Sequence, residues 1–427
     1  MHKVKKPKGE YKRLTKCRFC ESESLINILD FGPVPLAGGF LKEKDFQYEK
    51  YYPLDLNFCK DCFLVQTSNV VSGETLFQND YFFFSSAIKT LVIHFSDFAD
   101  ELNSNIFQDI NNPLVLEIGC NDGVLLKPLA KLGIRCIGVD PATNVVKSLI
   151  NAEDFIIVND FFSEQLAQQL RDRHGTIDAI LSSFSFAHID DMVDVMRGIK
   201  VLLKKDGIFV FEIYYLGTLI EEMQYDMIYH EHMSYYSLKT LQIFLKKFNM
   251  EIFDAKFISK VRSGCVRFYA RNIGEGNEDI SSGILEMAKK EEANGYDDFK
   301  IYSEYAQKVS STKIQLLDLL QTLKNEGKTI IGYGASGRGT TIMNYCGIDG
   351  KYLDYVVDDA PAKHSFFTPG THVPIKPWEF MAESEFPDYI LLFAWAFTDE
   401  VIKKRQDYLN RGGKFIIPLP EVRIVSY

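Results

Sequence analysis

The stretch that decides the fold is Pro113-Leu-Val-Leu-Glu-Ile-Gly-Cys-Asn-Asp-Gly123. Its apolar first half is typical of a buried strand, and its glycines allow a sharp turn into a helix expected at Val124–Leu132. Such a turn at the carboxyl end of a parallel strand brings the backbone close to a ligand. A second strand, Arg135–Asp140, ends in an acid about 20 residues beyond the turn, where a carboxylate can hold both hydroxyls of a ribose.

The sequence of this turn limits which ligands it can bind. It reads Glu-x-Gly-x-x-x-Gly, not the Gly-x-Gly-x-x-Gly of a dinucleotide fold, and it lacks the Lys-Ser/Thr pair that grips a nucleoside triphosphate. Further strands, expected at residues 155–158, 178–183 and 208–213, alternate with helices such as residues 191–203. This alternation predicts an α/β fold with a mostly parallel, doubly wound sheet of Rossmann-like type.

A second unit of the same kind follows near the C-terminus. Residues 328–341 combine a strand with a glycine-rich turn, residues 355–359 end a strand in two acids, and residues 389–393 and 414–417 supply two more strands. Arg338 and the backbone N–H groups of the turn suit an anion. A turn that only packs is the alternative. Between the two units, residues 284–326 have the spacing of long charged helices with one apolar face.

Two cysteine pairs near the N-terminus, Cys17/Cys20 and Cys59/Cys62, have C-x2-C spacing, with 38 residues between the pairs. Two such turns complete a tetrahedral four-thiolate site, which suits zinc. The intervening residues 25–53 are rich in glycine and proline, as expected of a small loop-rich module that needs a metal to fold. The site has no open position for a substrate, so a structural zinc is predicted.

The most polar part of the chain is Tyr229-His230-Glu231-His232, between the two glycine turns. Such proton-carrying groups are typical of acid/base chemistry rather than of a core. In an extended segment the two histidines would share one face and Glu231 the other. The zinc-protease motif places its histidines one helical turn apart, which this spacing does not. Ser237 is the expected cap of a helix over residues 238–248.

Length and composition set the remaining bounds. We expect 427 residues to form a zinc-binding module (1–75), a cofactor-binding domain (76–272), and a helical connector with a C-terminal domain (273–427). A net charge of −10 argues against nucleic acid as a partner, and the basic run Lys3–Arg13 is expected to be a solvated tail. Without a signal peptide or a spanning segment, the expected location is the cytoplasm, away from membranes. A monomer and a homodimer both stay open.

These motifs together resemble a known family, the S-adenosylmethionine-dependent C-methyltransferases of nucleotide-linked 4-keto-6-deoxysugars. The resemblance implies a zinc module, a class I methyltransferase domain and a second Rossmann-like domain. It extends from Cys17 to about residue 418. The matching stretches are the four cysteines, Leu116–Gly123, Ile228–Tyr235, Gly332–Ala335 with Asn344–Ile348, and Pro369–Ile375.

The resemblance also implies roles for individual residues. His232 would be the general base, with Tyr229, Glu231 and His230 as its neighbours. Residues expected along S-adenosylmethionine are Glu117, Gly119, Asn121, Asp122, Asp140, Asp160 and Phe161. Residues expected to contact the nucleotide sugar are Tyr81, Ser85, Gly334, Arg338 and Lys363.

The chain departs from the family's pattern in three places. Ser182-Ser183-Phe184-Ser185 replaces an Asn-rich stretch, Arg338 stands where Lys is usual, and Arg262-Ser263-Gly264-Cys265 replaces a His-Gly-Gly-Ser loop. Arg338 keeps the charge of Lys but changes the geometry of its hydrogen bonds.

The expected mechanism follows from the need to methylate a carbon atom of the substrate. Methylating carbon requires a carbanion equivalent, which a ketone supplies once a base removes the neighbouring proton. A hydrogen-bond donor, Tyr229 or His230, would then stabilise the oxyanion. The alternatives are an O- or N-methyltransferase acting on a phosphorylated or nucleotide-linked metabolite, and a zinc scaffold with a decayed cofactor fold. C3 is the family's usual methylation site and C5 the other.

Overall fold

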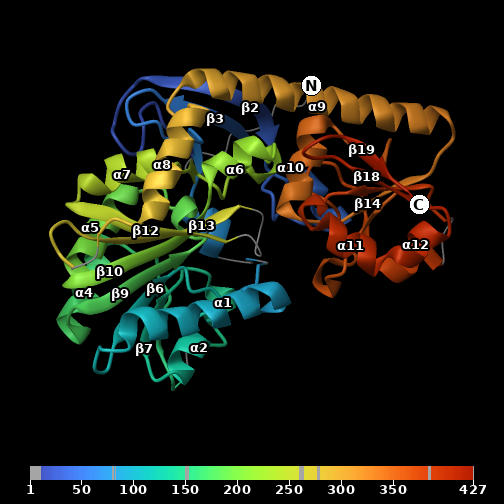
Figure 1. Cartoon of the computed structure of the whole chain (residues 1–427). Helices are drawn as coiled ribbons and strands as arrows, with labels where there is room; N and C mark the ends of the chain where they lie inside the picture. The colour runs from blue at the N-terminus through green and yellow to red at the C-terminus, as the bar shows by residue number, and fades with distance from the viewer. Residues whose placement is uncertain are drawn as a thin grey trace.

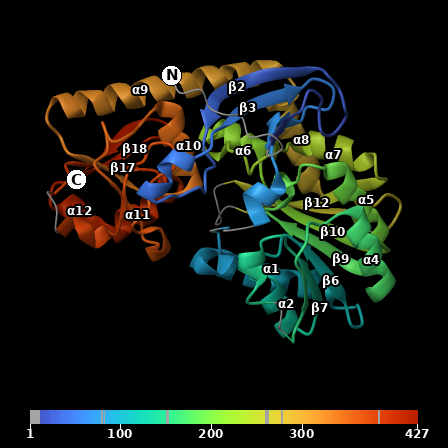
Figure 2. The ribbon, with the colours of Figure 1, turned by 180° about the vertical axis from the view of Figure 1, so that it is seen from behind.

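The computed structural model describes residues 11–78, 81, 83–149, 153–258, 264–276, 279–382 and 386–426. Two α/β units stand side by side, and the long helix α9 (Phe299–Asn325) runs across both (Figure 1). The N-terminal strands lie under the first half of α9, on the same side of the molecule (Figure 2). The central segment, defined as residues 225–235, lies where these parts meet.

The first unit is a seven-stranded sheet with the strand order β12-β13-β10-β9-β6-β7-β8. All its strands are parallel except β13, which is antiparallel to both of its neighbours. The strands are β6 (Leu114–Ile118), β7 (Arg135–Val139), β8 (Ile156–Val158), β9 (Ile177–Ser183), β10 (Leu203–Tyr214), β12 (Met250–Ile258) and β13 (Cys265–Asn272). The predicted doubly wound sheet is confirmed. Because the chain departs from β6 in both directions, the crevice at the carboxyl ends of β6 and β9 is the expected ligand site.

Alternating residues of the strands point to opposite faces of this sheet and pack into two apolar layers, one on each face. Leu116 packs into the layer that contains α4 and α5, whereas Val115 packs into the layer that contains α1 and α2. This period of two is why the strands read as continuous apolar runs. The helices of the unit are α1 (Lys89–Leu102), α2 (Leu126–Lys131), α3 (Thr143–Val146), α4 (Glu164–His174), α5 (Met192–Leu202), α6 (Leu216–Glu221) and α7 (Leu238–Lys246). Ser237 caps α7 as predicted, because its Oγ accepts a hydrogen bond from the backbone N–H of Thr240.

The N-terminal module is an antiparallel sheet with the strand order β11-β4-β3-β2. Its members are β2 (Leu25–Val34), β3 (Tyr52–Cys59), β4 (Val65–Gln66) and β11 (Ser234–Tyr235). Since β11 belongs to the central segment, that segment is hydrogen-bonded directly into the module. A further strand, β1 (Tyr11–Arg13), pairs with β5 (Asn69–Val71). The expectation that Lys3–Arg13 is a solvated tail is therefore wrong for its last three residues, and the rest lies outside the described residues.

The C-terminal unit is a six-stranded sheet with the order β16-β15-β14-β17-β18-β19, parallel except for β19. Its strands are β14 (Ile330–Tyr333), β15 (Val356–Val357), β16 (Ile375–Lys376), β17 (Tyr389–Leu392), β18 (Lys414–Ile417) and β19 (Arg423–Val425). Its helices are α10 (Gly337–Cys346), α11 (Thr398–Lys404) and α12 (Gln406–Asn410). The second doubly wound sheet is thus confirmed, and α8 (Ser282–Asn294) and α9 form the predicted helical connector.

In the segment just before α1, the Phe84 side chain is 40% exposed and so is not part of the core. The loop whose sequence departs from the family has Arg262 and Ser263 outside the described residues. Across the described part of the chain, no helix is both long and apolar enough to cross a membrane.

Candidate functional site

Glu117 lies in β6, two residues before the first glycine turn, and is only 2% exposed. Its Oε2 atom has no hydrogen-bond partner among the described residues. Burial, and then the charges of Asp140 and Glu212, raise the pKa of Glu117 well above its ordinary value. A buried carboxyl group in this state favours a ligand that brings hydrogen-bond donors or positive charge. Glu117 therefore fits a nucleoside with ribose hydroxyls and a nearby cation.

Gly119 lets the chain turn immediately after β6. Its φ of +76° is unfavourable for any residue with a side chain, and an added Cβ atom would lie 2.5 Å from the Cβ of Ser185. Ser185 in turn donates a hydrogen bond of 2.6 Å from its Oγ to the carbonyl of Ile118. The serine-rich stretch that departs from the family's pattern thus braces the glycine turn.

Asp140, after β7, holds the same turn from the neighbouring strand. One carboxylate oxygen accepts a hydrogen bond of 2.9 Å from the backbone N–H of Asn121, and the other accepts one of 2.8 Å from Ala142. Burial raises the pKa of Asp140. The predicted acid therefore lies beside the turn, where its first task is to fix the backbone.

The segment before α1 lies over the turn. Asn121 accepts a hydrogen bond of 2.9 Å from the backbone N–H of Ser85 and donates one of 3.0 Å to the carbonyl of Phe83. Ser86 donates a hydrogen bond of 2.6 Å from its hydroxyl to Asp122. The backbone N–H of Tyr81 donates to Asn144 at 3.2 Å. Ser85, expected on the substrate, is thus bonded directly to Asn121, expected on the cofactor, whereas Tyr81 is bonded to α3.

Asp160 and Phe161 take no part in these hydrogen bonds. Asp160 is exposed, and its carboxylate accepts a hydrogen bond of 2.8 Å from the backbone N–H of Phe161. The Phe161 ring packs against Gly73, where an added Cβ atom would lie 2.8 Å from it. Phe161 therefore borders the N-terminal module at the end of β8.

Within the central segment, residues 229–232 form a tight turn rather than an extended strand, because the backbone N–H of His232 donates a hydrogen bond of 2.9 Å to the carbonyl of Tyr229. The arrangement of an extended segment, with both histidines on one face, therefore does not apply here. His230 and His232 are both buried, at 1% and 3% exposure, and they point to different partners.

His232 lies among aromatic rings at the carboxyl edge of the first sheet. Its Nδ1 is 2.7 Å from the carbonyl oxygen of Met227, which can only accept, so Nδ1 carries a hydrogen and, in the neutral ring, Nε2 carries the lone pair. Its ring centroid is 4.0 Å from that of Tyr229, 5.0 Å from that of His188 and 5.2 Å from that of Tyr214. This geometry gives a histidine in a fixed tautomer, as a general base requires.

His230 faces the N-terminal module instead. Its Nε2 donates to the carbonyl of Pro53 at 3.2 Å, and its ring meets Tyr52 edge-on at 5.9 Å. Burial lowers the pKa of His230 to about 4, so it is neutral at physiological pH. Glu231 is half-buried next to Gly38, and burial raises its pKa to about 7.

The C-terminal glycine turn reaches the central segment from the other side. An added Cβ atom on Gly337 would lie 3.7 Å from the ring of Tyr229. Arg338 donates two hydrogen bonds, of 2.7 and 3.0 Å, to Asp226 of the central segment. Lys363 donates to the carbonyl of Ala335 at 2.5 Å and to Asp358 at 3.2 Å. Both basic groups of the expected anion site thus already contact acceptors of the protein.

Gly334, the last expected substrate contact, follows β14 directly. Its φ is +95°, and an added Cβ atom would lie 3.1 Å from the Cβ atom of Ala394, which follows β17. It therefore lies at the crevice between β14 and β17, where a ligand of a doubly wound sheet is expected.

Sequence reasoning missed three residues of this region: His188, Tyr214 and Asp226. His188 ends a short 3₁₀ turn after β9, and Tyr214 is the last residue of β10. Their place at strand ends was the available signal, because the carboxyl ends of parallel strands share one edge. Asp226 offered no such signal, since its partner Arg338 is 112 residues away.

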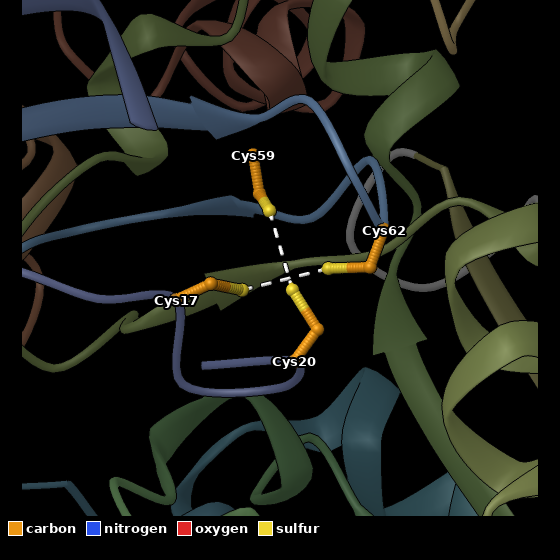
Figure 3. Close-up of side chains that lie close together, drawn as sticks. All are labelled: Cys17, Cys20, Cys59 and Cys62. Atoms are coloured by element: carbon orange, nitrogen blue, oxygen red, sulfur yellow. Dashed lines mark hydrogen bonds between the residues drawn. The ribbon is translucent and has the colours of Figure 1, made fainter. Parts of the chain in front are cut away.

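The four cysteines form one cluster in the N-terminal module (Figure 3). Their sulfur atoms all lie within 4.8 Å of one another, and Cys17–Cys62 and Cys20–Cys59 are each 3.5 Å apart. Figure 3 shows the four side chains converging on one point from two hairpin-like turns. Four convergent, mostly buried thiols fit a closed tetrahedral zinc site.

The first cysteine turn also contacts the first α/β unit. Phe19 stacks on Phe244 of α7 with ring centroids 3.7 Å apart. Arg18 donates a hydrogen bond of 2.6 Å to the carbonyl of Thr67, and the backbone N–H of Thr67 donates to the carbonyl of Met233 at 3.1 Å. The zinc site is therefore linked to the residue that follows His232.

Comparison with known proteins agrees with this arrangement. Three family models match: a zinc binding domain at residues 17–77, a methyltransferase domain at residues 93–254, and the C-methyltransferase C-terminal domain at residues 260–420. The C-methyltransferase NovU of Streptomyces niveus is 30% identical over 414 residues, which make up 97% of each chain. Similarity to that protein therefore extends through all three units.

Other similarities are partial. The mitochondrial ubiquinone biosynthesis O-methyltransferase of Bos taurus is 30% identical over 119 residues, 25% of this chain and 32% of its own. A solved S-adenosylmethionine-dependent methyltransferase from Archaeoglobus fulgidus is 17% identical, covering 42% of this chain and 94% of its own, with a TM-score of 0.34. That score supports no conclusion by itself, so the assignment of the chain to a family rests on the full-length relative.

Proposed function

This chain belongs to the S-adenosylmethionine-dependent C-methyltransferases, and we propose that it methylates C3 of a nucleotide-linked 4-keto-6-deoxysugar through an enolate. The kind of reaction and the methyl donor follow from the family. The sugar, the carbon and the base are the proposal. Its main support is the fixed tautomer of His232 at the carboxyl edge of the first sheet.

The cofactor would lie along the first glycine turn. Bound S-adenosylmethionine supplies an electrophilic methyl group on a positively charged sulfur. Glu117 would accept hydrogen bonds from it with the buried oxygen that now lacks a partner, and Asp140 would keep the turn in shape beside the ribose. Gly119, Asn121 and Asp122 would line the same turn, and Asp160 with Phe161 would border the adenine. Zinc, held by the four cysteines, takes no part in the chemistry.

His232 would act as the base. Its Nε2 would take the proton from the carbon next to the ketone, and the C–H electron pair would become that of the enolate. The same carbon would then bond to the methyl group as the methyl–sulfur bond breaks and its electron pair stays on the sulfur, which becomes neutral. The Nδ1–H bond to Met227 holds the ring throughout and stabilises the imidazolium that forms. The proton then passes from His232 to solvent, so no covalent enzyme intermediate is required.

The oxyanion would be stabilised by Tyr229, whose ring is the nearest of those around His232. Since His230 donates to Pro53, we assign it to holding the segment against the module rather than to the oxyanion. Glu231 would accept a hydrogen bond from a sugar hydroxyl. Tyr81 and Ser85 would border the sugar from the first unit.

Gly334 and Lys363 would face the nucleotide from the C-terminal unit. The three units would serve as a zinc module (1–75), a methyltransferase domain (76–272) and a connector with a nucleotide-facing domain (273–427). A fixed histidine could also deprotonate a hydroxyl, so the preference for carbon over oxygen or nitrogen rests on the full-length C-methyltransferase relative and on the C-methyltransferase C-terminal domain.

The experiment is incubation with nucleotide 4-keto-6-deoxysugars in D2O, with and without S-adenosylmethionine, read by NMR and mass spectrometry. We expect deuterium at one ring carbon without the cofactor and a methyl group at the same carbon with it. His232→Ala should lose both signals by at least about 100-fold, whereas the control His174→Gln, a half-exposed histidine at the end of α4, should keep both. A methyl group without exchange at that carbon would refute the enolate mechanism.

A further inference from the structure

Asp226, Arg338 and Trp395 form a buried ionic cluster, here called the Asp226 clasp, between the central segment and the C-terminal unit. Asp226 is 0% exposed. It accepts two hydrogen bonds from Arg338, at 2.7 and 3.0 Å, and one of 2.7 Å from the indole N–H of Trp395. The Arg338 guanidinium also lies 4.7 Å from the centre of the Trp395 ring.

The shape of the guanidinium matters here. Two parallel N–H bonds to one carboxylate require the planar fork of arginine, and the single ammonium of lysine cannot reproduce them. A carboxylate with no exposure also cannot replace a lost partner with bulk water. Asp226 and Arg338 are therefore fixed relative to each other, although 112 residues separate them in sequence.

The clasp is attached to the proposed base through one residue. Asp226 lies in a 3₁₀ turn, Tyr225–Met227, and the carbonyl of the adjacent Met227 accepts the Nδ1–H bond of His232. The same carbonyl accepts a hydrogen bond of 3.2 Å from the hydroxyl of Tyr235. Fixing Asp226 therefore fixes the acceptor that sets the tautomer and direction of His232.

We infer that Arg338 is a positioning residue, which orients the His232 base through Asp226 and Met227, and is not a ligand of the substrate's phosphates. Its effect on catalysis rests on the proposed role of His232, whereas its effect on the central segment does not. The inference also accounts for arginine where the resemblance leads one to expect lysine. A phosphate ligand tolerates either cation, but the clasp requires the fork.

The variants Arg338→Lys and Asp226→Asn test this. Lysine preserves the charge, and asparagine preserves the size and an acceptor for Trp395. The matched control is Arg405→Lys, since Arg405 pairs with Asp359 at 2.5 Å and stacks on Trp378 at 3.9 Å, entirely within the C-terminal unit. Hydrogen–deuterium exchange of the ligand-free proteins, read by mass spectrometry, needs no knowledge of the substrate.

We expect both clasp variants to exchange at least about 10-fold faster than wild type in residues 225–235, with residues 250–258 of β12 unchanged as a check on global folding. The control should match wild type in both peptides. In turnover assays, Arg338→Lys should lower kcat by about 100-fold and change KM less than about threefold, because a misplaced base costs rate rather than binding.

Wild-type exchange in residues 225–235 of both variants would overturn the inference, whatever the activity. A raised KM with unchanged kcat in Arg338→Lys would also overturn it, since that is the behaviour of a substrate ligand. If wild type methylates no nucleotide sugar, the proposed function fails, and the exchange experiment still decides whether the clasp holds the segment.

Discussion

The two glycine turns of this protein share a plan and differ in what they leave available. Both follow the first strand of a doubly wound sheet, and both contain a glycine with positive φ, Gly119 at +76° and Gly334 at +95°. Each second strand ends in an acid that accepts a 2.8 Å hydrogen bond from the backbone two residues later, Asp140 from Ala142 and Asp358 from Ala360. The local backbone solution is the same in both units.

The side chains around the turns are not the same. Two residues before its turn glycine, the first sheet has the buried acid Glu117, whereas the second has Gly332, where an added Cβ atom would lie 2.7 Å from the ring of Phe393. The acids after the second strands also differ in their second hydrogen-bond partner. Asp140 accepts from the backbone of its own glycine turn, whereas Asp358 accepts from the side chain of Lys363. The first turn therefore retains a buried carboxylate oxygen, on Glu117, that can accept a hydrogen bond from a ligand. The charged groups beside the second turn pair with partners within the protein.

The largest expected effect tests whether the first turn depends on the zinc module as much as the central segment does. Structural zinc sites contribute on the order of 10 kcal/mol to folding, so Cys17→Ser should unfold the module and release the central segment from Thr67. Methyl transfer should be lost, but S-adenosylmethionine should still bind, because Asp140 and Ser85 hold the first turn from within its own unit.

Calorimetric titration of the cofactor measures this, and Cys136→Ala is the control, because Cys136 is a buried cysteine of β7 outside the cluster. If binding disappears together with methyl transfer, the first turn depends on the module as much as the central segment does.

The next largest effect is expected from alanine substitutions at the matched glycines of the two turns. Gly119→Ala and Gly334→Ala carry similar backbone strain, because both positions have positive φ. Only Gly119→Ala drives a methyl group into Ser185, so only this variant should weaken S-adenosylmethionine binding, by about 100-fold, as expected for a displaced contact. Equal loss of affinity in both variants would show that the turns are not functionally distinct.

This contrast marks how far the sequence could lead. The strands, the turns and the cysteine cluster were predictable, because each depends on spacing within a short stretch. The capping of α7 by Ser237 was predictable for the same reason. The directions of His230 and His232 were not, because they depend on Pro53 and Met227 and on a turn that forms only between packed units. The pairing of Asp226 with Arg338 was equally hidden, since nothing local distinguishes it from a solvated acid.

A smaller loss of cofactor affinity is expected when the acid after the second strand of each sheet is replaced by asparagine. Asp140→Asn should weaken S-adenosylmethionine binding by about 10-fold, because a hydrogen bond to a charged acceptor is worth roughly 1.5 to 3 kcal/mol. Asp358→Asn should leave cofactor affinity unchanged, since Asp358 pairs with Lys363 in the other unit. Both affinities can be measured by the same titration. Cofactor binding weakened by Asp358→Asn would mean that the C-terminal turn takes part in holding the cofactor.

The smallest effect is expected at His230 and Glu231, which lie between the two turns in sequence and whose pKa values are shifted in opposite directions. The pKa of His230 is lowered from 6.5 to about 4, so its contribution to stability is complete above pH 6.5 and is lost as the pH falls toward 4. The pKa of Glu231 is raised from 4.5 to about 7, so its contribution is complete below pH 4.5 and is lost as the pH rises through 7. Between these limits the two trends oppose each other, and wild type should show a flat profile.

Each variant should expose the other residue's trend. His230→Gln, which retains a donor for Pro53, should lose stability as the pH rises from 5 to 8. Glu231→Gln should lose it as the pH falls below 6.5, by on the order of 1 kcal/mol at pH 5.5. Urea unfolding at several pH values measures both slopes. A wild-type profile in both variants would mean that neither group titrates in a buried site, and that water reaches both side chains.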